Sequence, residues 1–217
     1  MKPPIIIWLR QDQRLSDHPA LAAAEASKRK VIPCYVLDTR DTRPWRPGGA
    51  SRWWLYHSLS EMGQRIREQG GDLLLKHGDP VNIITELALE VGASTVYWSR
   101  AVEPHCRCDE AALASALETH GIGSEGFAGN LLFAPEMIQN RSGAPFRVFT
   151  PFWKHCLANG SRMRAPTGPV SPEFSTDLPD GDALDDWGLL PTHPNWASGL
   201  KETWQPGEAA GQTLLHK

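Results

Sequence analysis

The densest cluster of potential metal ligands in the sequence is His105, Cys106 and Cys108. Imidazole and thiolate groups bind zinc, and structural zinc sites usually join one CxxC or HxxxH pair to a second pair elsewhere. No second pair accompanies this cluster, and Cys34 and Cys156 stand alone. The spacing therefore argues against a metal site. Four cysteines in a chain without an evident leader are typical of reduced thiols rather than of a disulfide scaffold.

Several well-known catalytic motifs are missing from the sequence. It has no GxxxxGK[S/T] phosphate loop, no GxGxxG fingerprint after its first apolar run, no GxSxG elbow and no HExxH pair. These motifs mark nucleotide hydrolases, dinucleotide-binding enzymes, α/β-hydrolases and metalloproteases respectively. We therefore predict no complete active site of these kinds.

The apolar pattern alternates between short buried runs and amphipathic segments. Such alternation is typical of a doubly wound, Rossmann-like parallel sheet with helices on both faces. We predict five strands and four helices in this α/β fold. The strands are Ile5–Leu9, Val31–Leu37, Leu73–Leu75, Thr95–Trp98 and a weaker Ile122–Phe127, and the helices are Pro19–Ala26, Ser51–Gln69, Pro80–Val91 and Asp109–Thr119.

Ligands of doubly wound sheets bind outside the carboxyl ends of the strands. Three loops follow the strands at that edge and carry polar side chains: Arg10–Arg14, Asp38–Arg52 and Ser99–Asp109. The candidate functional residues should therefore lie in these loops. The arginines Arg40, Arg43 and Arg46 favour a solvated loop over a nucleic-acid patch, because the chain is acidic.

The composition divides the chain into four regions. Residues 1–130 are predicted to form the α/β core, 131–159 its last loop and helix, 160–203 a long irregular linker, and 204–217 the first turns of a further helical domain. The net charge of −3 predicts no strong direct binding of DNA by this chain. The apolar run at the N-terminus is too short to cross a membrane or to form a signal peptide, which predicts a cytoplasmic location.

The segment Trp8–Leu21 resembles the opening motif of the DNA photolyase/cryptochrome family, Trp-Phe-Arg-x-Asp-Leu-Arg-Leu-x-Asp-Asn-Pro-Ala-Leu. It departs from this motif at Leu9, Gln13 and His18. Five further segments resemble family motifs in the same order along the chain. They are Ser51–Leu59, Gly78–Pro80, Glu103-Pro104 with Arg107 and Asp109, Arg147–Lys154 and Trp204–Ala210.

The resemblance implies a specific architecture and function. Photolyases join an N-terminal α/β domain through a long linker to a helical domain that holds FAD and grips UV-damaged DNA. Photoexcited reduced FAD then splits a cyclobutane pyrimidine dimer. The α/β domain carries an antenna chromophore that passes excitation energy to FAD. The present chain corresponds to the antenna domain, the linker and the start of the FAD domain, so we expect the FAD site to lie outside it and the chain alone to be inactive.

The resemblance also implies an antenna site over the strand ends. Arg10 and Arg52 would hold a ligand carboxylate or phosphate, and Glu103 would accept a hydrogen bond from a ring N–H. The expected cofactor-binding residues are Arg10, Val36, Leu37, Asp38, Arg52, Leu55 and Glu103. We predict Trp8, Trp53, Trp54 and Trp98 to be core or pocket-wall residues rather than an electron-transfer chain.

The choice of chromophore rests on the loop after the fourth strand. Folate-binding members carry an Asn-Glu pair where this chain has Pro104-His105, so deazaflavin or FMN is favoured over folate. Cys106 takes the place of a smaller glycine in deazaflavin-type members, which leaves an empty slot as an alternative. Two alternatives remain for the whole chain, a cryptochrome-type photoreceptor fragment and a stand-alone nucleotide- or flavin-binding module.

Overall fold

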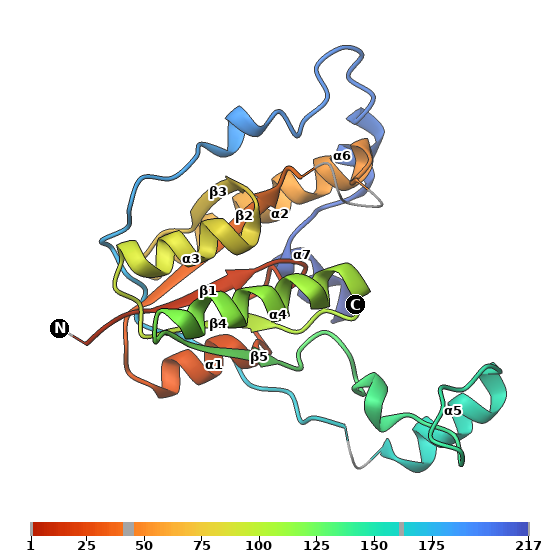
Figure 1. The fold of residues 1–217 in the computed structure, drawn as a ribbon. Coiled ribbons are helices and arrows are strands. Elements are labelled where there is room, and N and C mark those ends of the chain that lie inside the picture. Colours follow the sequence, from red (N-terminus) through yellow and green to blue (C-terminus); the bar gives the residue numbers. More distant parts are fainter. Residues whose placement is uncertain (1, 41–45, 161–162, 217) are drawn as a thin grey trace.

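The protein folds around one parallel sheet of five strands (Figure 1). The computed structural model describes residues 2–40, 46–160 and 163–216, so Arg43 lies outside the described residues. The strand order is β3-β2-β1-β4-β5 and every pairing is parallel, as the sequence predicts. The strands are β1 (Ile5–Leu9), β2 (Val31–Asp38), β3 (Leu74–Gly78), β4 (Thr95–Ser99) and β5 (Gly123–Phe127).

Alternating side chains of the strands build two separate cores. On β1, Ile5, Ile7 and Leu9 face one side, where the first two helices pack. Ile6 and Trp8 face the opposite side, where the next two helices pack. Successive side chains of a strand point to opposite faces, so a run that is apolar throughout is buried on both sides. The four covering helices are α1 (Pro19–Ala26), α2 (Gly49–Glu68), α3 (Pro80–Glu90) and α4 (Pro104–Thr119).

The central position of β1 creates the topological switch point of the sheet. From β1 the chain passes outward to β2 and β3, and then crosses to β4 on the other side of β1. The loops that leave the carboxyl ends of β1 and β4 therefore run to opposite faces. A crevice forms where two such loops diverge, and ligands of this fold class bind there.

Two elements differ from the sequence expectation by more than two residues at one end, whereas the others differ by at most two. The third strand runs two residues past the polar Lys76, because backbone pairing with β2 continues through Asp38 opposite Gly78. The fourth helix starts at Pro104 rather than at Asp109. Proline at the first position of a helix gives up no intrahelical hydrogen bond, and Glu103 supplies the extended residue before it. Most of the predicted loop after β4 is thus helical.

A buried contact between an imidazole and a carboxylate fixes the loop between β1 and α1. The Nε2 atom of His18 lies 2.9 Å from Oδ2 of Asp12, and both side chains are almost fully buried. The backbone amide of Arg10 donates to Asp12 at 2.8 Å. The Nδ1 atom of His18 accepts from the amide of Leu21 at 3.2 Å, so His18 is the N-cap of α1. One imidazole therefore both caps the helix and holds the loop.

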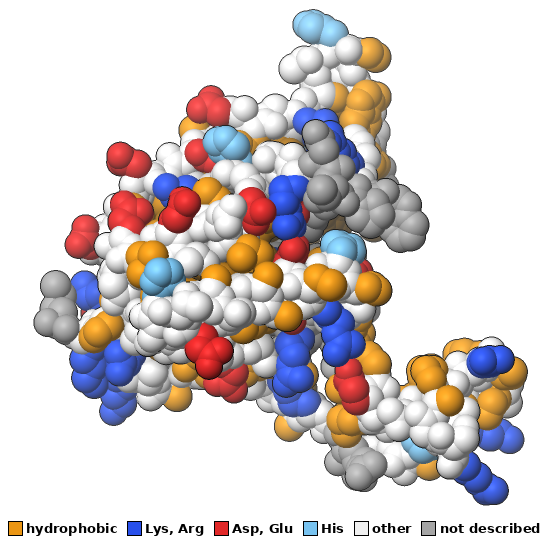
Figure 2. Space-filling model, viewed as in Figure 1, with side chains coloured by type: hydrophobic (Ala, Val, Ile, Leu, Met, Phe, Trp, Pro, Cys, Tyr) orange, Lys and Arg blue, Asp and Glu red, His pale blue; other side chains and the backbone are white. Residues whose placement is uncertain are grey.

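The region after β5 extends away from the sheet (Figure 1). It contains the short helix η1 (Pro135–Met137) and the helix α5 (Phe149–Ala158). Phe149 and Trp153 stack with their rings 8° from parallel and are 71 % and 50 % exposed. Figure 2 shows hydrophobic and basic side chains side by side on this part of the surface.

The segment after residue 163 returns to the α/β core. A backbone bridge pairs Phe174 with Val31 at the start of β2. Asp17 in the β1–α1 loop accepts from Thr167 at 2.8 Å and pairs with Arg164 at 2.7 Å. The hydrogen bond from Arg164 and those from Thr167 lower the pKa of Asp17 to about 2. The segment also contains η3 (Leu184–Trp187), α6 (Ser198–Thr203) and α7 (Glu208–Leu215).

Glu208 fastens the last helix to the same loop. Its carboxylate accepts from the amides of Leu15 and Ser16 at 2.7 and 2.9 Å and also binds Arg65 of α2. Burial opposes the charged form, but the hydrogen bonds and Arg65 outweigh it and lower the pKa of Glu208. Among the described residues, we find no helix that is both long and apolar enough to cross a membrane.

The Asp12–His18 pair predicts a pH-dependent loss of stability. Burial would raise the pKa of Asp12, but its hydrogen bonds lower it from 3.8 to about 2. A carboxyl with a lowered folded-state pKa stabilises the fold above its unfolded pKa, and this stabilisation is lost as the pH falls towards 2. We expect Asp12→Ala to lower the unfolding free energy at pH 7 by about 3 kcal/mol, as for other broken buried pairs.

Urea unfolding at pH 7 and pH 3 checks this expectation. The deficit of Asp12→Ala should be smaller at pH 3 by about 1 kcal/mol, because the wild-type carboxylate is then partly protonated on unfolding. The exposed pair Arg67–Asp72, with an N–O distance of 3.0 Å, offers the control Asp72→Ala. That variant should lose less than about 1 kcal/mol. An equal loss in both variants would contradict the assigned role of Asp12.

Candidate functional site

A cleft of about 400 Å³ opens over the carboxyl ends of the strands. Its walls come from the β1–α1 loop, the end of β2, the first half of α2 and the start of the loop after β4. This position is the switch point of the sheet, and the volume is in the range of small-molecule sites. The lining residues are Trp8, Arg10, Gln11, Asp12, Gln13, Tyr35, Val36, Leu37, Asp38, Pro47, Ser51, Trp54, Leu55, Pro80, Ser99, Ala101, Cys106 and Asn130.

Arg10 crosses the cleft from β1 to α4. Its guanidinium lies 4.4 Å from the ring centre of Trp8. Its Nη2 atom pairs with Glu110 at 2.5 Å and donates to the carbonyl oxygen of Ser99. Its Nη1 atom is buried and makes no hydrogen bond to any described residue. The Nη2 atom of Arg10 therefore binds the protein, whereas its Nη1 atom remains available to donate a hydrogen bond to a ligand.

A second buried donor of the cleft residues is unsatisfied. Within the described ranges, the indole Nε1 of Trp8 has no hydrogen-bond partner. Buried polar groups nearly always find partners in proteins, because an unpaired group costs about 1–3 kcal/mol. Two such donors on neighbouring residues of one cleft indicate a place for a ligand with hydrogen-bond acceptors.

The charge of Asp38 is matched by Arg40. Arg40 binds Asp38 at 2.7 Å and Asp109 of α4 at 2.6 Å, and it approaches Asp79 at 3.7 Å. The hydrogen bonds from Arg40 to Asp109 and Asp38 keep the pKa of Arg40 above its ordinary range. Arg40 is thus bound into the strand ends rather than solvated, which corrects the sequence expectation for this residue.

The cleft collects five of the seven antenna residues expected from the sequence, Arg10, Val36, Leu37, Asp38 and Leu55. Arg52 does not line the cleft, and its Nη2 atom donates to the carbonyl oxygen of Gly188 at 2.6 Å. Residue 52 lies one helical turn before Leu55, so helix periodicity alone does not exclude it from the cleft. The hydrogen bond to Gly188 instead holds the Arg52 guanidinium against the returning segment.

Glu103 also lies beside the cleft rather than in its wall. It is the N-cap residue of α4, and its carboxylate accepts from the side chain of Gln11 at 3.4 Å and from the amide of Val102 at 3.2 Å. Its pKa is lowered by its own backbone amide first, and by Gln11 and Val102 in addition. Since Gln11 lines the cleft, Glu103 can reach a ligand only through Gln11.

Sequence reasoning missed Glu110, which anchors Arg10. Glu110 also accepts from the amide of Ala101 at 2.7 Å and so closes the loop after β4 onto α4. With the helix start at Pro104, Glu110 falls four residues after Cys106, which lines the cleft. Residues four apart share a helix face. Pro104 was the signal in the sequence that could have placed the helix start, and with it Glu110.

The cysteines and histidines do not form a metal centre in the parts of the chain that the structure describes. There, no group of three or more His, Cys, Asp or Glu side chains has the geometry to hold a metal ion. Cys34 is buried in the sheet, and burial raises its pKa to about 12. A thiol with such a pKa is a poor metal ligand or nucleophile at neutral pH.

The fold and the cleft define an α/β domain with a cofactor-sized site at its switch point. The family model described as DNA photolyase matches residues 5–173. This match covers most of the chain, and the chain belongs to the DNA photolyase family.

The most informative relatives are photolyases and cryptochromes. A deoxyribodipyrimidine photo-lyase of Agrobacterium fabrum is 39 % identical over 213 residues, which cover 98 % of this chain and 44 % of that protein. Cryptochrome-2 of Arabidopsis thaliana is 33 % identical over 158 residues, 72 % of this chain and 26 % of that protein. The chain thus spans less than half the length of these relatives.

Solved structures agree with this assignment. A bacterial class III photolyase from Agrobacterium tumefaciens superposes with a TM-score of 0.91 and 37 % identity, over all of this chain and 44 % of that one. A cryptochrome of Synechocystis sp. PCC6803 has the same fold, with a TM-score of 0.82 and 24 % identity over 98 % of this chain and 45 % of that one.

The role of Arg40 at the strand ends predicts a stability defect. Replacing it by methionine removes the guanidinium that bridges Asp38 and Asp109. We expect Arg40→Met to lower the unfolding free energy by about 1–3 kcal/mol. The loss should be below that of a fully buried pair, because the Arg40 side chain is 23 % exposed.

Urea unfolding at pH 7 measures this effect. The control Arg67→Met removes the guanidinium of an exposed pair whose side chains are 56 % and 52 % exposed, and it should cost less than about 1 kcal/mol. Equal stability of the two variants would show that Arg40 does not bind the strand ends together.

Proposed function

We propose that this chain is the light-harvesting-chromophore domain of a DNA photolyase. The observation that carries the proposal is the cleft at the switch point, in which Arg10 and Trp8 keep buried hydrogen-bond donors without partners among the described residues. In the proposed role, the bound chromophore absorbs light and passes the excitation energy to FAD. Such transfer needs a fixed orientation of the chromophore but no chemistry by the protein.

The cleft suits a flat, uncharged heteroaromatic ring. Its charged side chains Arg10, Asp12 and Asp38 are each matched by Glu110, His18 and Arg40. Trp54 and Tyr35 supply aromatic surface, and Val36, Leu37 and Leu55 supply apolar surface. The Nη1 atom of Arg10 and the indole of Trp8 can donate to ring carbonyls or ring nitrogens. Flavins, deazaflavins and pterins all offer such acceptors.

We prefer a flavin-type chromophore to a folate, as the sequence suggests. This preference rests on Pro104 and His105, and neither residue lines the cleft. Their influence would have to act through α4, whose next residue, Cys106, does line it. Titration with both ring types decides between them.

The repair of UV-damaged DNA is proposed for the full-length protein and not for these 217 residues alone. A deoxyribodipyrimidine photo-lyase relative aligns with nearly the whole chain, at 39 % identity. The runner-up is a cryptochrome photoreceptor, which is favoured by the 33 % identity to cryptochrome-2 over a shorter stretch. We propose that FAD and damaged DNA bind in regions beyond those aligned here.

Substitutions in the cleft test the chromophore site. We expect Arg10→Ala and Trp54→Ala each to weaken binding of a flavin or a folate at least tenfold, because one removes a hydrogen-bond donor and the other a stacking surface. Fluorescence titration gives the dissociation constants. Arg52→Ala serves as the comparison and should change binding less than twofold. A loss at Arg52 as large as that at Arg10 would contradict the assignment of the site to this cleft.

The 217-residue chain should show no light-driven repair by itself. Illumination with a dimer-containing oligonucleotide and added reduced flavin should leave the dimer count at the level of a flavin-only control. The net charge of −3 also predicts binding of this oligonucleotide that is weak and decreases with salt. Repair above the control, or nanomolar binding at physiological salt, would contradict the proposal that repair and DNA binding need regions beyond these 217 residues.

A further inference from the structure

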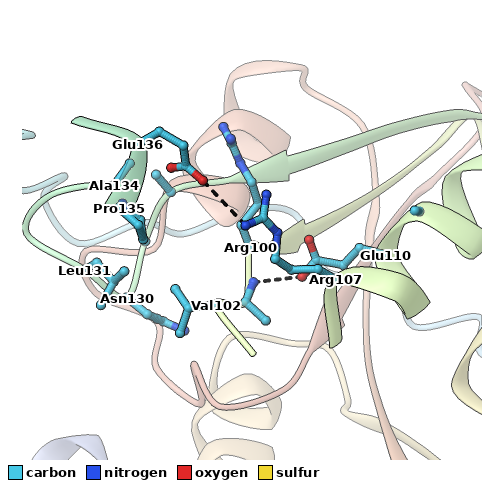
Figure 3. Close-up of a pocket in the computed structure, with 13 residues that line it drawn as sticks. Arg100, Val102, Arg107, Glu110, Asn130, Leu131, Ala134, Pro135 and Glu136 are labelled. Atoms are coloured by element: carbon cyan, nitrogen blue, oxygen red, sulfur yellow. Dashed lines mark hydrogen bonds and ion pairs between the residues drawn. The ribbon is translucent and has the colours of Figure 1, made fainter. Parts of the chain in front are cut away.

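A second pocket of about 310 Å³ lies directly beside the cleft (Figure 3). Ala101 and Asn130 line both cavities, so the two are neighbours over the carboxyl ends of the strands. The walls of this side pocket come from the loop after β4, the first turns of α4 and the loop after β5. Its lining includes the apolar side chains of Val102 and Leu131.

The side pocket carries two arginines with little competition for their charge. Arg107 reaches from α4 toward Glu136 (Figure 3), but this pair is 3.6 Å long and both side chains are 61 % exposed. Arg100 donates through Nε to the carbonyl oxygen of Gly126 at 2.9 Å and makes no ion pair with a described residue. Glu110 is already bound by Arg10 and by the amide of Ala101.

The cleft and the side pocket therefore differ in the ligand chemistry they favour. Charges in the cleft are matched within the protein, so an anionic group there would gain little. In the side pocket, an anion could replace the loose contact of Glu136 and gain the guanidinium groups of Arg100 and Arg107. Guanidinium groups bind carboxylates and phosphates in bidentate fashion.

We propose that the side pocket receives the anionic tail of a chromophore whose ring system lies in the cleft. The tail is a phosphate or a chain of carboxylates, and it enters past Ala101 and Asn130. This inference rests on the proposed antenna function of the cleft. It adds a subsite that selects chromophores by their tail rather than by their ring.

Two pairs of probes that share a ring and differ in the tail test the inference. FMN and riboflavin differ by a phosphate, and pteroyltriglutamate and pteroylglutamate differ by two carboxylates. For a ring that binds, the wild-type chain should bind the probe with the more anionic tail at least tenfold more tightly. The pair that shows the difference identifies the tail as phosphate or carboxylate.

Variants then locate the effect. In the double variant Arg100→Ala/Arg107→Ala the preference should fall below threefold, while the affinity for riboflavin, which has no anionic tail, stays unchanged. Arg29→Ala is the matched control, because Arg29 contacts the carbonyl oxygen of Pro3 near the amino ends of the strands. That variant removes the same charge at the opposite edge of the sheet and should keep the full preference.

The outcomes separate the two claims. Equal binding of the two probes of each pair to the wild-type chain would overturn the tail site and leave the antenna function standing. A preference that persists in the double variant would also overturn the tail site. Failure of all four probes to bind would overturn the antenna function and the tail site together.

Discussion

The buried pair of Asp12 and His18 is the contact on which the cleft depends. A carboxylate removed from water is costly unless it is paired, so this contact restricts the geometry of the loop. Asp12 holds the amide of Arg10, and His18 starts α1. The residue after β1 is therefore fixed in direction, and its guanidinium lies over Trp8 and reaches Ser99 and Glu110 on the far side of the switch point.

The same principle governs the rest of the site. Each charged group in the cleft wall has a partner within the protein: Arg10 has Glu110 of α4, Asp12 has His18 at the start of α1, and Asp38 has Arg40 after β2. These pairs hold the walls of the cleft together. The hydrogen-bond donors left over belong to Trp8 and Arg10. A cavity of this kind orients a flat ring, whereas the neighbouring pocket, with loosely held arginines, is suited to charge.

Local patterns in the sequence were sufficient for the sheet, and the family resemblance pointed to five residues of the cleft wall. The apolar run Ile5–Leu9 predicts a strand buried on both faces, and the position of this strand in the sheet puts Arg10 at the switch point. Two expected residues lie outside the cleft wall. Arg52 donates to Gly188, which is 136 positions away, so no local pattern could predict this contact. Glu103 was read as a loop residue because the helix start at Pro104 was overlooked. The pairing of Glu208 with Ser16, 192 positions away, leaves no local signal at all.

That distant pairing links the returning segment to the cleft. The β1–α1 loop is held from inside by Asp12 and His18, and from outside by Arg164 on Asp17 and by Glu208 on Leu15 and Ser16. These contacts converge on a stretch of about ten residues that also carries Arg10. Because Glu208 additionally binds Arg65 of α2, it ties together the two elements that face each other across the cleft. The segment after residue 163 therefore stabilises the β1–α1 loop from outside. The hydrogen bonds of Glu208 hold the last helix and this loop together.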